Sequence, residues 1–216
     1  MKFLVILISL MLSAFSCFAQ ETVDITIMDK KEGRKVVSYP IDTKKFSIGY
    51  GSYAMTIEGL EKLPDLETIE LIGTAFITDL SFIGKCQNLK HLVFWDDHIN
   101  DFSFLNKLKN LEALVMDSCS IKSFPTVYHM KKLRLLSLKY CGLSSFSEVK
   151  ELPENLEVLN LSGNKISSLK GLPATKAKII LRNTPLAANK SLAQDNLIFS
   201  DDGENIIQKE YWMYIQ

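Results

Sequence analysis

The sequence predicts a solenoid of stacked short repeats, with one parallel β-strand in each repeat. The spacing Leu-x-x-Leu-x-Leu recurs at steps of 22 or 23 residues, and a second apolar motif follows it at matching positions. A unit of this length cannot enclose a hydrophobic core alone, so neighbouring units must stack. The strand motif alternates Leu-x-Leu, which leaves one side of each strand outside that core. The motif starts at Leu66, Leu89, Leu111, Leu133, Leu156 and, in degraded form, Lys176, with a weaker copy at Thr43.

The composition is that of an ordinary globular protein. The 216 residues suffice for one domain or two small ones, and 47% of them are apolar. Lys and Arg total 25, and Asp and Glu total 25, so the formal net charge is zero. Binding to a phosphate backbone or an anionic lipid surface needs a surplus of basic side chains. Nucleic acid and membrane surfaces are therefore excluded as the main partner.

Residues 1–19 have the layout of a secretory signal peptide. Lys2 gives a positive start, residues 3–15 are almost entirely apolar, and Cys17-Phe18-Ala19 ends the segment. The apolar run is shorter than the ~20 residues of a membrane-spanning helix, so we expect cleavage after Ala19 and no transmembrane segment in the mature chain. A lipid anchor on Cys17 is the alternative, because Ala14–Cys17 loosely matches a lipoprotein box. Both routes predict an exported protein, periplasmic, secreted or on the cell surface.

On these repeats the chain resembles the leucine-rich-repeat family, in particular its internalin-like class with 22-residue units. The resemblance covers residues 43–186, about seven rungs. It implies an α/β-type solenoid, a right-handed horseshoe with a parallel concave β-sheet and short extended or 3₁₀ segments on the convex side.

Family repeats usually carry an asparagine three residues after the last strand leucine, where its amide binds the backbone of neighbouring turns. Only Asn164 keeps this residue. Asp97 cannot donate a hydrogen bond when ionised, so its rung should be less well tied than that of Asn164. The other rungs have Thr74, Cys119, Cys141 and Thr184 at this position.

The two ends of the chain are predicted to be β-hairpin caps. In residues 20–42, alternating apolar residues precede a turn at Lys30–Gly33 and a second apolar stretch follows. In residues 187–216, Leu197–Phe199 precede a turn at Asp201–Gly203, and Ile206-Ile207 follow it. The closing residues 211–215 are apolar enough to seal the last rung.

The second apolar motif contributes an aromatic column of Phe102, Phe124 and Phe146. Identical positions in successive rungs point inward together, so this column is predicted to be core and not an aromatic binding box. Ser123, beside Phe124, is expected to face solvent.

We expect no catalysis, no metal site and no cofactor. The sequence lacks the Gly-Lys-Ser/Thr phosphate loop and the His-Glu-x-x-His, Gly-x-Ser-x-Gly and Cys-x-x-Cys motifs. His91 and Asp96 are too far apart along an extended strand, at ~3.3 Å per residue, to form an acid–base pair. Cys119 and Cys141 occupy equivalent positions ~5 Å apart, but their side chains run parallel, which favours two buried free thiols over a disulfide.

The concave face of the middle rungs is the candidate binding site. Side chains between the strand leucines point to this face, and an apolar centre with a polar rim is typical of protein-recognition surfaces. β-branched residues are also ordinary strand formers, and a cap or a second copy of the chain could cover the face. The candidate site residues are His91, Val93, Trp95, Asp96, Val115, Asp117, Leu135, Lys139 and Tyr140.

The sequence therefore predicts an exported binding module that recognises a macromolecule through its concave face without catalysis. The family resemblance implies a protein partner. Two alternatives remain, a structural or assembly subunit whose concave face is permanently occupied, and a lipid-anchored surface adhesin. An exported enzyme is a more distant third, and turnover abolished by His91→Ala would reveal it.

Overall fold

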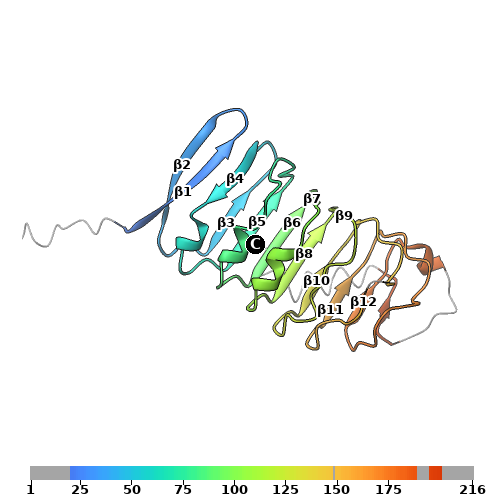
Figure 1. Ribbon diagram of the computed structural model, residues 1–216. Helices are drawn as coiled ribbons and strands as arrows, with labels where there is room; N and C mark the ends of the chain where they lie inside the picture. Colours follow the sequence, from blue (N-terminus) through green and yellow to red (C-terminus); the bar gives the residue numbers. More distant parts are fainter. Residues whose placement is uncertain (1–19, 148, 189–194, 201–216) are drawn as a thin grey trace, which may run out of the picture.

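In the computed structural model the chain forms a solenoid built on an eight-stranded parallel sheet (Figure 1). The structure describes residues 20–147, 149–188 and 195–200. Strand order follows chain order, so each rung adds its strand beside the strand of the previous rung. The strands are β3 (Lys45–Ile48), β5 (Thr68–Ile72), β6 (His91–Trp95), β8 (Ala113–Asp117), β10 (Leu135–Ser137), β11 (Val158–Asn160), β12 (Lys178–Ile180) and β13 (Leu197–Ile198).

The strand register confirms the repeat alignment. Thr68 pairs with His91, His91 with Ala113, and Ala113 with Leu135, and each is the first residue of its strand. The predicted repeat of 22 or 23 residues is therefore one turn of the solenoid.

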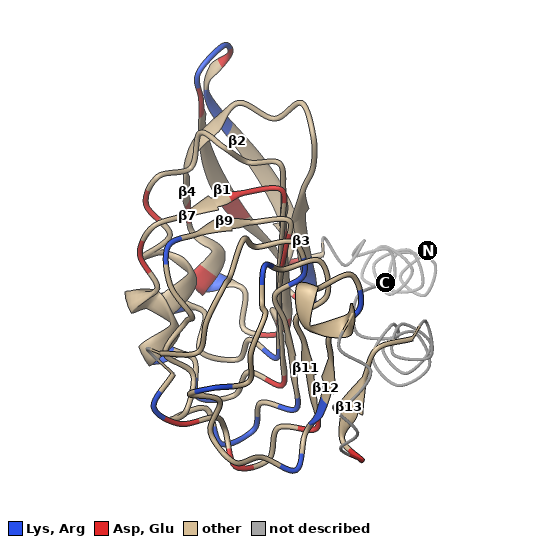
Figure 2. Cartoon of the chain, turned by 90° about the vertical axis from the view of Figure 1, so that its right-hand side faces the viewer, with Lys and Arg blue, Asp and Glu red and all other residues tan. Residues whose placement is uncertain are grey.

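One side of the sheet faces the main hydrophobic core. The leucines of the strand motif, such as Leu92, Leu114 and Leu136, are fully buried there. Figure 2 looks along the stack, with β11 and β12 on one side and the returning segments of the turns on the other. These segments include η1 (Leu60–Lys62), η2 (Ile83–Lys85), η3 (Ser103–Lys107) and η4 (Pro185–Ala188), all 3₁₀ helices, and the short parallel pair β7 (His98–Ile99) and β9 (Ser120–Ile121).

The three phenylalanines of the aromatic column are not equally buried, contrary to the prediction. Phe146 is fully buried, whereas Phe102 and Phe124 are half-buried and pack against the core from its margin. Phe104 takes the inner place in its rung, because η3 turns this ring inward to within 6.1 Å of the ring of Phe94, between centroids. Ser123 is half-buried and does not face solvent fully, contrary to expectation.

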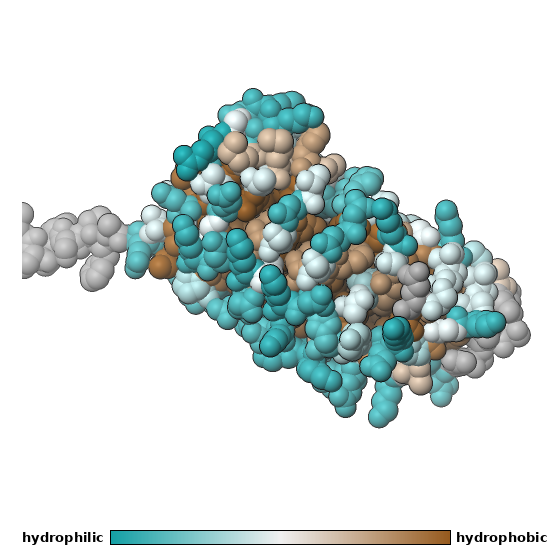
Figure 3. All heavy atoms as spheres, viewed as in Figure 1, coloured by the Kyte–Doolittle hydropathy of each residue, from teal (hydrophilic) through white to brown (hydrophobic). Residues whose placement is uncertain are grey.

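The N-terminal segment forms the predicted hairpin, with β1 (Thr22–Asp29) antiparallel to β2 (Gly33–Pro40). The carboxylate of Asp29 accepts hydrogen bonds from the backbone N–H groups of Lys31 and Glu32, at 2.8 and 3.1 Å, and so fixes the turn. A third strand, β4 (Ala54–Glu58), pairs antiparallel with β1. Strand β4 was not predicted, because it lies inside the range of the first predicted repeat. Figure 3 shows apolar side chains gathered where this sheet meets the solenoid.

The prediction of a C-terminal hairpin is wrong for its first strand. Leu197–Ile198 form β13, which pairs in parallel with β12 and extends the main sheet. An antiparallel hairpin strand was expected here, but the rung ladder continues instead. The expected second half of that hairpin and residues 211–215 lie outside the described residues.

At the repeat position where the family usually has asparagine, Asn164 makes the predicted hydrogen bonds to the backbone of neighbouring turns. Nδ2 of Asn164 donates to the carbonyls of Leu138 and Leu161, at 2.7 and 2.8 Å. Its Oδ1 accepts from the backbone N–H groups of Cys141 and Leu143, at 3.0 Å each. These four bonds connect the side chain of Asn164 both to its own rung, at Leu161, and to the preceding rung, at Leu138, Cys141 and Leu143.

Asp97 makes fewer bonds at the same position. Its Oδ1 accepts from the N–H and the hydroxyl of Thr74, at 2.6 and 3.0 Å. Its Oδ2 has no hydrogen-bond partner, although the side chain is buried. Burial raises the pKa of Asp97 to about 6, against the opposing effect of the Thr74 bonds. The rung of Asp97 therefore has fewer hydrogen bonds to its neighbour than the rung of Asn164.

The thiols at this position are free and buried, as expected. Cys119 and Cys141 are each at most 4% exposed, and burial raises the pKa of both to about 12. The thiol of Cys141 lies 2.8 Å from the carbonyl oxygen of Met116, within donating distance. These cysteines act as small apolar side chains with weak donors.

Candidate functional site

The side of the parallel sheet that faces away from the main core, here called the outer face, carries the predicted columns. Its aliphatic side chains form a second hydrophobic cluster, separate from the main core, with Ile198 packed against it. The strands position these residues because alternate side chains of a strand point to opposite faces. This set is named the outer apolar cluster: Val93, Ala113, Val115, Leu135, Val158 and Ile180.

The exposure of this cluster was predicted wrongly. Val93 and Val115 were expected to face solvent, but they are 5% and 7% exposed, and Leu135 is completely buried. Adjacent rungs lie ~4.8 Å apart, so these aliphatic side chains cover one another's flanks. The apolar centre expected for the binding site is therefore an interior cluster.

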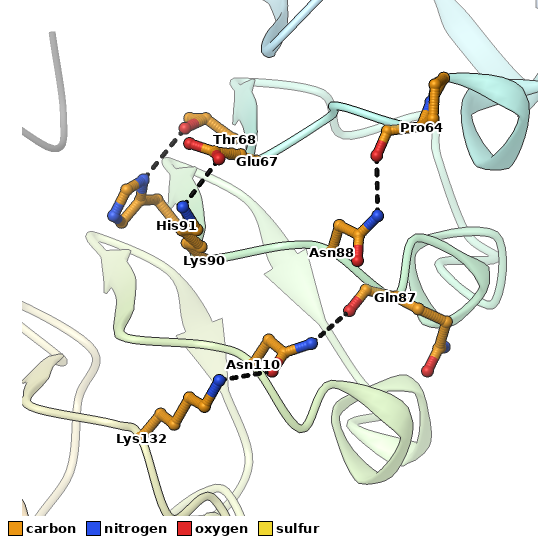
Figure 4. Close-up of polar contacts among 9 residues, drawn as sticks. All are labelled: Pro64, Glu67, Thr68, Gln87, Asn88, Lys90, His91, Asn110 and Lys132. Carbon is orange, nitrogen blue, oxygen red and sulfur yellow. Dashed lines mark hydrogen bonds and ion pairs between the residues drawn. The ribbon is translucent and has the colours of Figure 1, made fainter.

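His91 is also buried, contrary to expectation. Its Nδ1 lies 3.1 Å from the hydroxyl of Thr68 on the neighbouring strand (Figure 4). Burial lowers the pKa of His91, although the charges of Glu112 and Glu67 oppose this effect. Burial thus favours the neutral form of the imidazole. His91 begins β6, whereas Asp96 follows the end of that strand.

The edge where the strands end presents the exposed part of the predicted site. Trp95 and Tyr140 are 51% and 53% exposed, as predicted. Each rung turns sharply here through a residue with positive φ, such as Asp96 at 59° and Tyr140 at 54°. The turn sends the aromatic side chain outward while the chain returns towards the core.

Glycines of the next rung make room for two of these rings. A Cβ at Gly163 would collide with the ring of Tyr140, and a Cβ at Gly73 would collide with the ring of Tyr50. Tyr50 is 66% exposed, and its hydroxyl lies 3.4 Å from the carboxylate of Asp96, which accepts the hydrogen bond. Tyr50, Trp95 and Tyr140 are named the aromatic edge.

Tyr50 was not among the predicted site residues, although the repeat pattern contains a signal for it. Tyr50 and Tyr140 share one repeat position, and each is followed one rung later by glycine at that position. The tyrosine–glycine pair indicates a ring that lies flat on the next rung.

Asp117 and Lys139 lie beside the aromatic edge and are half-buried. The carboxylate of Asp117 accepts from the hydroxyl of Ser137 at 2.6 Å and from the backbone N–H of Lys139 at 3.1 Å. Asp117 therefore fixes the backbone of the next rung as well as contributing charge to this edge.

The opposite edge of the sheet, where the strands begin, carries a row of charged residues that was not predicted. The residue before each strand from β5 to β11 alternates in charge from rung to rung. Lys90 binds Glu67 at 2.7 Å, and Arg134 binds Glu157 through two hydrogen bonds of 2.6 and 2.9 Å. This charged edge consists of Glu67, Lys90, Glu112, Arg134 and Glu157, and Figure 2 shows blue and red segments along its loops, at the lower end of the view.

Asparagines strengthen the charged edge. The side-chain amide of Asn88 donates to the carbonyl of Pro64 at 2.7 Å, and that of Asn110 donates to the carbonyl of Gln87 at 3.0 Å (Figure 4). A depression of about 630 Å³ opens here between residues that include Glu112, Arg134 and Glu157. The depression is open, unlike the enclosed apolar pockets that typically hold small molecules. The ion pairs and amide bonds of the charged edge each join neighbouring rungs.

Within the described ranges, no group of three or more His, Cys, Asp or Glu side chains could hold a metal ion. No helix among the described residues is long and apolar enough to cross a membrane.

Comparison with known proteins identifies the fold. No protein-family model and no curated protein sequence matches the chain. Internalin InlF from Listeria monocytogenes has a similar solved structure, with a TM-score of 0.52 and 20% identity over 77% of this chain and 57% of InlF. Internalin C2 from the same organism matches with a TM-score of 0.50 and 22% identity, over 67% of this chain and 74% of that protein. These likenesses confirm the predicted internalin-like leucine-rich-repeat fold.

Proposed function

We propose that this chain is an exported, non-catalytic leucine-rich-repeat module that binds a protein partner through its aromatic edge. The observation that carries the proposal is the exposure of Tyr50, Trp95 and Tyr140 along one edge of the sheet. Large aromatic side chains bury much apolar area on binding at low cost in conformational entropy, and their polar atoms tolerate water in the free protein.

The proposed contact surface is narrower than the face suggested by the sequence. It consists of the aromatic edge with Asp96, Asp117 and Lys139 beside it. His91, Val93, Val115 and Leu135 are left out because they are buried. Charges of both signs at the margin favour a protein partner with a mixed surface over a polyanion.

The proposal also includes the handedness of the solenoid, the cap on its first rung and the export signal. We take the solenoid to be a right-handed horseshoe with the outer face on its concave side. The β1–β2–β4 sheet then caps the first rung, which is supported by the burial of Ile25 and Ile57 in the main core. Residues 1–19 would direct export and be removed after Ala19.

The proposal is tested by capturing partners with the exported protein as immobilised bait. Trp95→Ala and Tyr140→Ala should lose the captured protein, whereas Tyr128→Ala should keep it. Tyr128 is the matched control, because it is 46% exposed and lies outside the aromatic edge, against His129. Equal capture by all three variants would contradict the proposed site, provided that their melting temperatures agree.

A further inference from the structure

Strand β2 leaves one of its two sides open. The N-terminal sheet has the order β2–β1–β4, so β2 is an edge strand and pairs with β1 alone among the described residues (Figure 1). It is eight residues long. Val36 and Val37, at its centre, are 50% and 40% exposed. A long edge strand with exposed aliphatic side chains is a template for pairing with a further strand.

The hairpin register shows which backbone groups point to the open side. The N–H of Ile41 donates to the carbonyl of Glu21 at 2.8 Å, and these two residues continue the β1–β2 register as a directly opposed pair. Opposed pairs of antiparallel strands alternate between hydrogen-bonded and non-hydrogen-bonded pairs. The odd-numbered residues of β2 therefore bond to β1. The N–H and C=O groups of Arg34, Val36 and Ser38 point outward, to the open side.

We propose that the open side of β2 pairs antiparallel with β2 of a second copy of this chain, around a two-fold axis at Val36. The two three-stranded sheets then join into one continuous sheet. The outward groups are symmetric about Val36, so the axis places Val36 opposite its equivalent and Arg34 opposite Ser38 of the second copy. Each of these hydrogen-bonded pairs exchanges two backbone bonds, which satisfies the outward N–H and C=O groups of all three residues.

Registers shifted by two residues are disfavoured. One shift places Lys35 directly opposite Lys35 of the second copy, and opposed like charges destabilise a sheet. The other places Pro40 in a hydrogen-bonded pair, but Pro40 has no N–H and its carbonyl already accepts from the N–H of Thr43 at 3.0 Å. Lysine and proline commonly protect a sheet edge against pairing. Here each disfavours one shifted register and leaves the register centred on Val36 open.

The charges of the two copies fit the centred register. Arg34 lies opposite Ser38 of the second copy, whose hydroxyl donates to the carboxylate of Asp24 at 2.6 Å. Arg34 and Asp24 are both exposed, so the guanidinium approaches a carboxylate across the new strand pair. Lys35 keeps its ion pair with Glu32, at 2.6 Å on its own hairpin.

The centred register also covers exposed apolar area. Val36 packs against its equivalent on the two-fold axis. Val37 lies opposite Ile25 of β1, which is completely buried, yet Val37 itself is exposed because β2 is the edge strand. In the dimer the aliphatic stem of Lys35 from the second copy lies beside Val37.

The interface is small, so the dimer is expected to be weak and dependent on concentration. Its formation does not depend on the aromatic edge, which lies on the sheet of the solenoid. Where the aromatic edge binds a partner, the dimer presents that edge twice, and a partner arrayed on a surface is held by both copies at once.

Sedimentation of the exported protein tests the dimer, at concentrations from about 1 µM to 1 mM, the range of weak protein–protein affinities. The parent chain should pass from monomer to dimer within this range. Val36→Pro should raise Kd by about ten-fold or more, because each copy loses one outward N–H. Val36→Thr is the matched control, because it keeps the N–H and the β-branched shape, and its Kd should stay near that of the parent.

Disulfide formation tests the register independently. In a hydrogen-bonded pair the Cα atoms are ~5.5 Å apart, within the range that a disulfide spans. Val36→Cys should therefore form a linked dimer in glutathione buffer about ten-fold faster, or more, than Thr56→Cys. Thr56 is exposed on the same face of the sheet, on β4, away from the proposed axis. The native thiols Cys86, Cys119 and Cys141 are buried and should not react.

Three results would overturn the proposal. One is a parent chain that stays a monomer at every concentration, which would leave the open side of β2 to a strand of another protein. The second is a dimer that Val36→Pro does not weaken, because that dimer uses another surface. The third is an equal rate of disulfide formation at positions 36 and 56. If Val36→Pro melts early at the lowest concentration, the disulfide rates alone decide.

Discussion

Asp97→Asn should stabilise the protein near neutral pH. The buried carboxylate occupies the position where Asn164 makes four backbone hydrogen bonds of 3.0 Å or less, but it receives only the two from Thr74. Asparagine could donate to the carbonyls of Leu71 and Phe94, which correspond by register to the two acceptors of Asn164. The substitution removes a buried charge and restores the missing donor.

The magnitude follows from the pKa of Asp97. Burial raises this pKa from 3.8 to about 6, so the folded state binds the proton more tightly than the unfolded state. The associated stability is fully present below about pH 4 and is lost as the pH rises to 6 and above. The complete loss is about 3 kcal/mol, since each tenfold change in proton affinity is about 1.4 kcal/mol. Asp97→Asn should recover much of it at about pH 7.5, a rise of roughly 5–10 °C in Tm for a chain of this size.

Thermal melts at about pH 4.5 and pH 7.5 check this prediction. The gain should be large at the higher pH and small at the lower. Asp96→Asn is the matched control, because it removes the same charge one residue away at an exposed position, and it should change Tm little at either pH. Equal gains at the two pH values, or no gain at pH 7.5, would refute the reasoning about the buried carboxylate.

Three further predictions concern packing, the aromatic edge and export. Phe146→Ala should cost about 3–5 kcal/mol of unfolding free energy, and Phe124→Ala clearly less because that ring is only half-buried, as denaturant titrations would show. Gly163→Ala should destabilise by about 1–3 kcal/mol, since φ is +70° and the new methyl meets the ring of Tyr140; an unchanged melt would mean that the ring lies elsewhere. Intact-mass analysis should find a mature chain that begins at Gln20 without lipid, whereas an acylated Cys17 would establish the anchored form.

The repeat alignment could be predicted because its signal is local and periodic. Leu-x-Leu alternation assigns each strand side chain to a face, and the step of 22 or 23 residues brings His91 beside Thr68 and Ala113. The hydrogen-bonding capacity of single residues was also predictable, because the repeat alignment shows which residues occupy equivalent positions. Asp97 lacks the donor that Asn164 has, and the structure confirms the difference.

Exposure could not be predicted in this way. Register places Leu135 on the outer face, but whether a second layer covers that face depends on tertiary packing. Strand β4 was missed because its partner is β1 in the N-terminal sheet and not another repeat. The inward place of Phe104, and not Phe102, follows from η3, whose turn the repeat pattern does not specify.

The affinity of the captured partner for Trp95→Ala tests the central claim most directly. Truncation of a large aromatic anchor typically costs about 2 kcal/mol or more, so Kd should rise by roughly thirty-fold or more while Tm stays near that of the parent chain. Tyr128→Ala, measured in parallel, should change neither quantity. A Trp95→Ala chain that binds with unchanged Kd, or that melts early and still binds normally, would contradict the assignment of the aromatic edge as the binding site.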